Sequence, residues 1–289
     1  MDMLSQTIQY AISGITAGSI YAVIGICWSV VYLITKVLNF TTGEFVMLGG
    51  MLTWGFHSLG FGLLPSVLFA VAGTIAVSML LERIVIRPIR VPTEMTYIMI
   101  TIAAASVIKG LILLKWGSES RPIEPFFGTE VIHILGAGVT PQVLFIVAVM
   151  ASITAGLHLF LNHTLIGTAL RASAINLTGA RLIGIDVDRF RLLCFGLAGG
   201  LGAVTGIVTA PITFTGYEIG LLNGLKGLVA AIVGGWTMTG TVAAGLALGL
   251  VEGFGAGFIS TGLKDVIALF LMIIFLILRT VSLPVKRRT

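Results

Sequence analysis

The sequence has few charged residues. Asp, Glu, Lys and Arg make up 10% of its 289 residues, against roughly a quarter of an ordinary globular chain. Hydrophobic residues make up 57%, and the mean hydropathy is +1.08. This balance excludes a soluble domain with a solvated surface and indicates an integral membrane protein built of helices. The 37 glycines support the same conclusion, because glycine is frequent where membrane helices pack closely.

Motifs for catalysis, metal binding and nucleotide binding are also missing. The sequence has no His-Glu-x-x-His, no Gly-x-Ser-x-Gly and no Gly-x-x-x-x-Gly-Lys-Ser/Thr phosphate loop. Cys27 and Cys194 both lie in apolar runs and are typical of small buried hydrophobes. None of the histidines has the spacing of a metal ligand; they are His57, His133, His158 and His163. We therefore expect no catalytic residue, no metal and no cofactor, and any ATP that drives this chain has to be split by another chain.

Nine apolar stretches come near the roughly 20 residues that cross a bilayer. They lie at 8–34, 41–57, 62–81, 95–114, 142–161, 191–212, 224–238, 240–260 and 264–281. We interpret 224–238 as a crossing, with a broken or re-entrant element as the alternative because it is short. No Lys or Arg precedes the first stretch, so it lacks the start of a signal peptide and we expect it to remain as a span. The predicted fold is an all-α polytopic bundle of eight or nine transmembrane segments, forming one domain over residues 1–289.

The basic residues predict the orientation. They gather in three short segments: Arg83, Arg87 and Arg90; Arg171, Arg181, Arg189 and Arg191; and Lys286, Arg287 and Arg288. Such clusters belong on the cytoplasmic side of a polytopic protein, and this explains the net charge of +5 better than a nucleic-acid partner does. The net acidic loop from Lys115 to Thr140 and the tract around Glu218 are expected outside. With 224–238 as a crossing, the N-terminus is outside and the C-terminus inside.

Two tracts of the sequence follow one plan. "LNFTTGEFVMLGG" and "ITFTGYEIGLLNGLKGLVAAIVGG" each follow a long apolar stretch and carry Thr-x-x-Glu before a glycine-bearing apolar run. With the orientation above they point in opposite senses, as in an inverted repeat, which places substrate sites near its interface; a chance match of short tracts is the alternative. Thr-x-x-Glu is also the capping box of a helix start, so Glu44 and Glu218 have two interpretations, capping and path lining. The path candidates from these tracts are Asn39, Thr41, Thr42, Gly43, Glu44, Glu218, Asn223 and Lys226.

Three charged residues lie within apolar stretches. A charge at the centre of a bilayer costs about 2.5–3.5 kcal/mol, so these side chains should face protein or water. Lys226 and Glu252 can pair; helix cohesion and a substrate path both explain them, and Glu252 joins the path candidates. Lys109 lies near the end of its stretch, from where it can reach the interface. Glycines beside Glu252 repeat every four residues on one helix face and predict a closely packed neighbour; they are Gly245, Gly249, Gly253 and Gly257.

The segment 162–190 is unusually polar for this chain. Polar residues recur along it with helical spacing, and small residues lie between them. The polar residues are Thr164, Thr168, Arg171, Thr178 and Arg181. A helix lying on lipid would carry bulky apolar residues opposite its polar face, whereas small residues suit close docking against another protein. We interpret the segment as a docking surface; a plain cytoplasmic loop that follows the charge rule is the alternative.

The same segment resembles the cytoplasmic coupling loop of ABC-transporter permeases of the branched-chain amino-acid (LivH) type. Their pattern Arg-Ala-x-Ala…Leu-Leu-Gly-Ile-Asn-x-Asp-Arg is matched by "RASA" from Arg171 and by "LIGIDVDR" from Leu182, with Ile183 for Leu and Asp186 for Asn. The likeness extends over nearly the whole chain, through "GSIYAVIGICWSVVY", "LNFTTGEFVMLGG", "GLKGLVAAIVGGW" and "KDVIALFLMIIFLILR" in the family's order. In the second of these, Thr41 and Thr42 replace the family's Ala-His.

This resemblance implies the permease subunit of an ATP-binding-cassette importer that moves branched-chain or related amino acids across the inner membrane of a prokaryote. The implied partners are two cytoplasmic ATPases that bind the ATP, a second homologous permease, a periplasmic or tethered substrate-binding protein and the lipid bilayer. It also implies that the loop at 162–190 couples to the ATPases; the residues concerned are Gly167, Arg171, Ala172, Ala174, Ala180, Arg181, Gly184, Ile185 and Asp186.

Two other kinds of protein remain alternatives. A secondary transporter driven by an ion gradient would also show inverted repeats and charges within its spans. A membrane scaffold that transports nothing would also keep its basic residues in short loops.

Overall fold

The computed structural model describes residues 3–89, 93–128, 130–134 and 136–258, and the single residues 266, 270, 273 and 274. The helices are α1 (Met3–Thr35), α2 (Thr42–Ser58), α3 (Leu63–Leu81), α4 (Glu94–Trp116), α5 (Pro141–His163), α6 (Leu165–Ile175), α7 (Leu177–Leu182), α8 (Val187–Thr213), α9 (Ile219–Val233) and α10 (Met238–Phe258). A π-helical turn, Glu82–Ile86, continues α3, and β1 (Ile132–Ile134) pairs antiparallel with β2 (Ala137–Val139). The predicted all-α membrane bundle is confirmed. Most of the predicted stretch 264–281, together with Arg90 and the cluster of Lys286, Arg287 and Arg288, lies outside the described residues.

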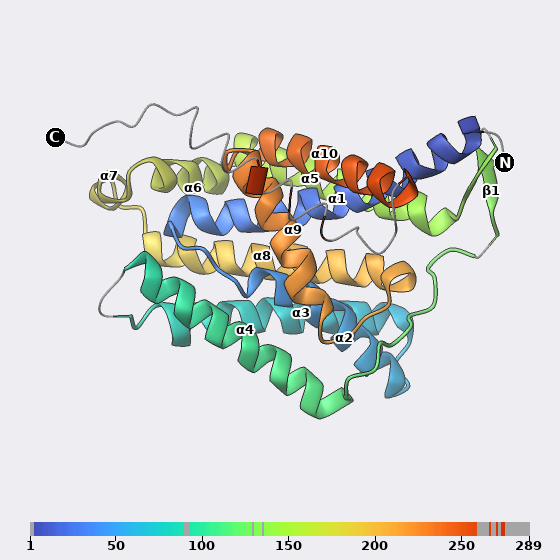
Figure 1. Cartoon of the computed structure of the whole chain (residues 1–289). Helices are drawn as coiled ribbons and strands as arrows, with labels where there is room; N and C mark the ends of the chain where they lie inside the picture. The colour runs from blue at the N-terminus through green and yellow to red at the C-terminus, as the bar shows by residue number, and fades with distance from the viewer. Residues whose placement is uncertain are drawn as a thin grey trace.

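Six of the described helices are long and apolar enough to cross a membrane; they are α1, α3 with its π-helical turn, α4, α5, α8 and α10. Helix α2 has 17 residues and α9 has 15, which rise only about 25 Å and 22 Å, less than the roughly 30 Å of a hydrocarbon core. Figure 1 shows α9 running obliquely across the long helices. Helix α9 is thus shorter than a full span, but the chain passes from Thr215, which pairs with Arg121, to Trp236, whose ring stacks on that of Tyr32 (4.0 Å) near the end of α1. The crossing at 224–238 stays a prediction.

Several helix ends follow signals in the sequence. The Thr93 hydroxyl accepts a hydrogen bond from the Thr96 amide (3.2 Å) at the start of α4, as an N-cap does. Gly117, with φ of 81°, ends α4, because glycine adopts this backbone conformation without a steric penalty. Pro141 is the first residue of α5, where its fixed φ suits a helix start.

The predicted glycine column packs α10 against α1. All four glycines of the column face α1, and a Cβ on Gly249 would overlap the backbone of Gly18. A Cβ on Gly253 would lie 2.7 Å from the Tyr10 carbonyl oxygen. Helix α1 supplies matching small residues at Gly14 and Gly18. The close approach that the spacing of four predicts is confirmed, and it places α1 in the centre of the fold.

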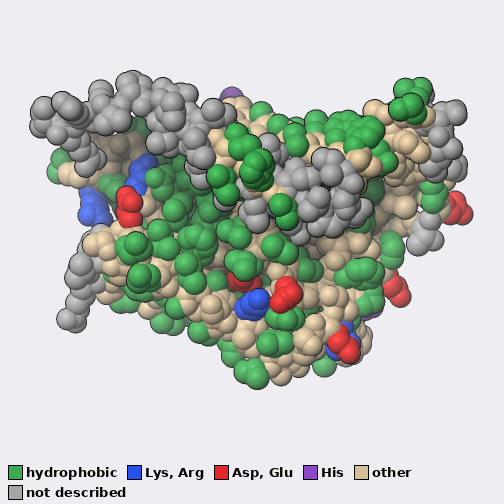
Figure 2. Space-filling view, in the orientation of Figure 1, with side chains coloured by type: hydrophobic (Ala, Val, Ile, Leu, Met, Phe, Trp, Pro, Cys, Tyr) green, Lys and Arg blue, Asp and Glu red, His purple; other side chains and the backbone are tan. Residues whose placement is uncertain are grey.

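The two ends of the bundle carry different charges. The N-terminus and β1 lie at one end, and α6 and α7 lie at the other (Figure 1). On the face shown in Figure 2, hydrophobic side chains dominate, basic ones gather at the end of α6 and α7, and acidic ones lie mainly at the opposite end. Arg87 and Asp188 (3.5 Å) join the first basic cluster to the second. The described clusters thus share one end of the molecule, as the charge argument predicts.

Two short helices begin in a similar way. The long helices α1 and α8 are each followed by a residue with positive φ, Lys36 (53°) and Phe214 (58°). A connector without helical structure comes next, and then the short helix α2 or α9. This common order agrees with the inverted repeat expected from the two sequence tracts.

Candidate functional site

The path candidates separate into two groups. Lys226 and Glu252 lie in an enclosed group with Tyr21, which the sequence analysis did not identify. The Lys226 ammonium donates to Glu252 Oε1 (3.0 Å) and to the Tyr21 hydroxyl (3.1 Å), and Tyr21 also donates to Glu252 Oε1 (3.0 Å). Lys226 and Glu252 are 5% and 0% exposed. The predicted pair therefore forms, and it fastens α9 to α1 and α10.

The second group surrounds the start of α2. Asn39, Thr41 and Thr42 are fully buried. The Asn39 side-chain oxygen accepts hydrogen bonds from the amide (3.2 Å) and hydroxyl (2.6 Å) of Thr41, and the Asn39 carbonyl accepts from the Thr42 hydroxyl (2.8 Å). These bonds fix the connector above the first turn of α2.

The capping interpretation of the two Thr-x-x-Glu tracts is wrong. No side chain caps the start of α2, because the Thr41 hydroxyl is bonded to Asn39 instead. At the second tract, α9 begins after Glu218, so the spacing from Thr215 no longer fits a capping box. Thr215 instead forms a β-bridge with Arg121, with N–O distances of 2.6 and 2.9 Å. Glu44 and Glu218 thus need another explanation.

Helices α2 and α9 cross at glycines. A Cβ on Gly43 would overlap the Gly220 carbonyl and lie 2.9 Å from the Gly224 Cα. A Cβ on Gly220 would lie 2.6 Å from the Glu44 carboxylate oxygen Oε2. The crossing therefore needs residues without side chains, and it places the buried Glu44 (3% exposed) against α9. It brings the two sequence tracts together.

Next to this crossing, Lys109 lies beside the start of α9. Its ammonium lies 4.0 Å from Glu218 Oε1 and 5.0 Å from the centre of the Tyr217 ring. Figure 2 shows basic and acidic side chains together in the middle of this face, where α4 and α9 lie. Lys109 thus has an acidic and an aromatic neighbour, and its extension to the membrane interface stays a prediction. Asn223 is half-buried on α9.

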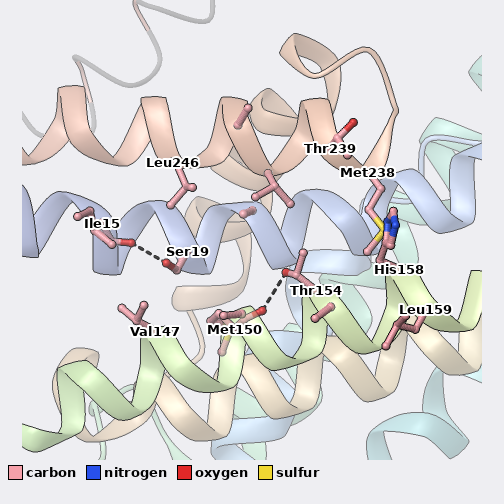
Figure 3. Close-up of a pocket in the computed structure, with 15 residues that line it drawn as sticks. Ile15, Ser19, Val147, Met150, Thr154, His158, Leu159, Met238, Thr239 and Leu246 are labelled. Carbon is pink, nitrogen blue, oxygen red and sulfur yellow. Dashed lines mark hydrogen bonds between the residues drawn. The ribbon is translucent and has the colours of Figure 1, made fainter.

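A large apolar cavity lies elsewhere. It has a volume of about 810 Å³ and lies between α1, α5 and α10, as Figure 3 shows. Its Ser19 and Thr154 hydroxyls donate to carbonyls of their own helices, at 2.7 and 2.8 Å. His158 is the one ionisable residue among those that line it. This cavity offers little to recognise a charged solute, so the start of α2 is the better candidate. The described residues also contain no group of three or more His, Cys, Asp or Glu that could hold a metal ion.

The segment 162–190 forms two short helices with capped starts. Thr164 accepts a hydrogen bond from the Gly167 amide (3.0 Å) at α6, and Asn176 accepts from the Gly179 amide (2.9 Å) at α7. Asp186 accepts from the Arg189 amide (3.2 Å) at α8. These caps stabilise each helix start by about 1 kcal/mol in water, so the sequence itself determines the bends of the segment.

The small residues of the segment do not form its outer face. Gly167 packs against the backbone of Phe160 and Leu161, and Ala180 is 3% exposed. Ala172, Ala174 and Ile185 are half-buried, whereas Arg171, Arg181, Gly184 and Asp186 are exposed. Four bulky aliphatic residues, which carried no signal in the sequence, are largely exposed; they are Leu165 (90%), Ile175 (87%), Leu182 (83%) and Ile183 (75%). The expectation of a small-residue docking surface is therefore corrected, because the small residues let the segment fold on itself and turn aliphatic residues outward.

Ion pairs tie the segment to the bundle. Arg191, near the start of α8, donates to Glu82 Oε1 (2.6 Å), and Glu82 is 1% exposed in the π-helical turn after α3. Arg191 also lies 3.6 Å from Asp188, which pairs with Arg87. These pairs join the end of the segment and the start of α8 to the end of α3.

Known proteins are similar to this chain over most of its length. A family described as "Branched-chain amino acid transport system / permease component" matches residues 10–276. The high-affinity branched-chain amino acid transport system permease protein BraD of Pseudomonas aeruginosa is 28% identical over 96% of both chains. The corresponding protein LivH of Salmonella typhimurium is 29% identical over 93% of this chain and 92% of its own. A solved structure, PsaBC from Streptococcus pneumoniae in complex with Fab, has a similar fold, with a TM-score of 0.53 and 12% identity over 93% of this chain and 90% of that chain.

Proposed function

Because the chain belongs to the permease family of branched-chain amino acid transport systems, we propose that it is the permease subunit of an ATP-binding-cassette importer. Its substrates are branched-chain or related amino acids, and it moves them across the inner membrane of a prokaryote. The observation that carries the proposal is the family match from residue 10 to residue 276. The absence of a phosphate-loop motif from the sequence supports a subunit that uses ATP bound by partners and holds no cofactor of its own.

The exposed segment 162–190 is the proposed contact with two cytoplasmic ATPases. Its aliphatic side chains, above all Leu182 and Ile183, offer apolar surface that is unfavourable in water and suits a groove on a partner. Arg171 and Arg181 add positive charge around it. When nucleotide binding closes the ATPases, the ion pair between Arg191 and Glu82 passes the displacement to α3 and α8. The change between inward and outward exposure is then a shift in populations that nucleotide binding drives.

The orientation follows from the same assignment. The end that carries α6, α7 and the described basic clusters faces the cytoplasm, in line with the positive-inside rule. The N-terminus and the β1–β2 hairpin then face outward, and the C-terminus lies inside. A periplasmic or tethered binding protein delivers the substrate at the outer end, and a second homologous permease completes the pore.

Uptake by purified components tests this proposal. Liposomes that contain this chain, the partner permease and the ATPases, with ATP enclosed and the binding protein and labelled leucine outside, are expected to accumulate leucine. Vanadate should abolish this uptake and a protonophore should not. Liposomes with this chain alone should take up nothing under a proton or sodium gradient. Gradient-driven uptake by the chain alone would instead establish a secondary transporter, and a complete assembly that is inactive with ATP would favour a scaffold.

A further inference from the structure

The start of α2 is a helix N-terminus inside the protein. A helix start presents N–H groups without intrahelical partners and a partial positive charge. Here Thr42, Gly43 and Glu44 of the first turn are buried; the Thr42 amide donates to the Asn39 carbonyl (3.1 Å), and no side chain caps the amides of Gly43 and Glu44. This is unusual, because the backbone N–H groups at a buried helix start normally have hydrogen-bond partners.

Two buried polar atoms at the same place have no partner among the described residues. They are the Asn39 amide nitrogen, a donor, and the Glu44 oxygen Oε2, an acceptor. Asn39 is 0% and Glu44 3% exposed. Asn39 is held over the helix start, since its side-chain oxygen is bonded to Thr41. Buried polar atoms in proteins are nearly always hydrogen-bonded, so these two atoms together point to a ligand.

The unused groups are complementary to the two charges of an amino acid. The amides of Gly43 and Glu44 and the Asn39 side-chain amide suit a carboxylate, and the Glu44 carboxylate suits an ammonium group. We propose that the start of α2 is an occluded site for the main-chain ammonium and carboxylate of an α-amino acid. The proposal rests on the function proposed above, and it names the part of the substrate that the membrane subunit itself recognises.

Helix α9 forms one wall of this site. Gly220 lies against the Glu44 carboxylate, where a Cβ would press on Oε2 at 2.6 Å, and Gly43 lies against the Gly220 carbonyl. The Lys226–Glu252 pair lies further along α9, so the wall of the site is the N-terminal half of this helix.

The pair of Lys109 and Glu218 lies at the edge of the site. Glu218 comes two residues before Gly220, which lies against the Glu44 carboxylate, and the Lys109 ammonium lies 4.0 Å from Glu218 Oε1. Both residues remain accessible, with side chains 31% and 68% exposed. They present one positive and one negative group to an arriving zwitterion before it reaches the buried groups.

The test replaces Glu44 and Asn39, one at a time, by residues of the same shape and measures uptake by the complete transporter. Glu44→Gln removes the negative charge, and Asn39→Asp exchanges the donor for a second carboxylate. We expect each variant to co-purify with the ATPases in wild-type amount, but to take up labelled leucine at least tenfold more slowly. The uptake of labelled valine should slow by the same factor, because the site contacts only the groups that all α-amino acids share. Glu94→Gln, at an exposed glutamate in the first turn of α4, is the charge-matched control and should stay within twofold of wild type.

Two results would overturn the site. The first is uptake within twofold of wild type in Glu44→Gln. The second is a reduction in leucine uptake that differs from the reduction in valine uptake by more than threefold. Such a difference would mean that the site contacts the substrate's side chain. If the proposed function is wrong, the result is different: the wild-type assembly itself then shows no ATP-driven uptake.

Discussion

At the scale of single residues, the charges inside the bundle are held by partners from other helices. Glu252 on α10 is fully buried, and it accepts hydrogen bonds from Lys226 on α9 and from Tyr21 on α1. A buried carboxylate persists only with such compensation. Sequence reasoning found Lys226 and Glu252, because charges in apolar runs are conspicuous. It missed Tyr21, because a tyrosine in a membrane span carries no comparable signal.

Removal of one partner should weaken the isolated chain. Glu252→Gln leaves Lys226 buried beside a neutral amide, and breaking a buried pair in this way costs about 3–5 kcal/mol. We expect the thermal unfolding midpoint of the purified chain in detergent to fall by on the order of 10 °C. Glu94→Gln should leave the midpoint unchanged. Equal midpoints for Glu252→Gln and wild type would show that the triad contributes no stability.

At the scale of the elements, hydrophobic length predicted most helices, and glycine spacing predicted that a helix packs closely on α10, without identifying that helix as α1. The starts of α2 and α9 were misread, because Thr-x-x-Glu matches a capping box in sequence whatever its surroundings. Tertiary contacts decided otherwise: Asn39 binds the Thr41 hydroxyl, and Arg121 pairs with the backbone of Thr215. The tilt of α9 relative to the long helices could not be predicted either, because it depends on the contact between glycines of α2 and α9, which are far apart in the sequence.

The packing of α10 on α1 predicts opposite effects for two glycines. An alanine is favoured over glycine in a helix by up to about 1 kcal/mol, so Gly156→Ala on α5, with open space around its Cβ, should keep or raise the unfolding midpoint. Gly249→Ala should lower the midpoint and the yield of monodisperse protein, because its Cβ overlaps the backbone of Gly18. Size-exclusion chromatography and thermal unfolding of both variants provide the check. If Gly249→Ala is as stable as Gly156→Ala, the two helices are not in close contact.

At the scale of the whole molecule, an apolar body carries a polar segment at one end. Composition and loop charges predicted this division, since lipid and water impose it directly. They did not predict which side chains of the segment point outward. Small residues such as Gly167 and Ala180 looked suited to a partner's surface, but they pack within the chain. The outward-facing Leu182 and Ile183 are visible only once α7 and its bend at Gly184 (φ 86°) are known.

The central claim is that an ATPase binds the segment 162–190 on the cytoplasmic side, and chemical cross-linking tests it most directly. Ile183→Cys adds a thiol that is exposed, whereas Cys27 and Cys194 are both buried. In sealed membranes that hold this chain and the partner permease without the ATPases, this thiol should react with a membrane-impermeant maleimide only from the cytoplasmic face. In the complete transporter, a thiol-to-amine cross-linker should join it to the ATPase. Val131→Cys, at an exposed position next to β1, should react only from the outside and form no such product. Labelling of Ile183→Cys from the outside, or its failure to cross-link in a transporter that hydrolyses ATP, would contradict the account.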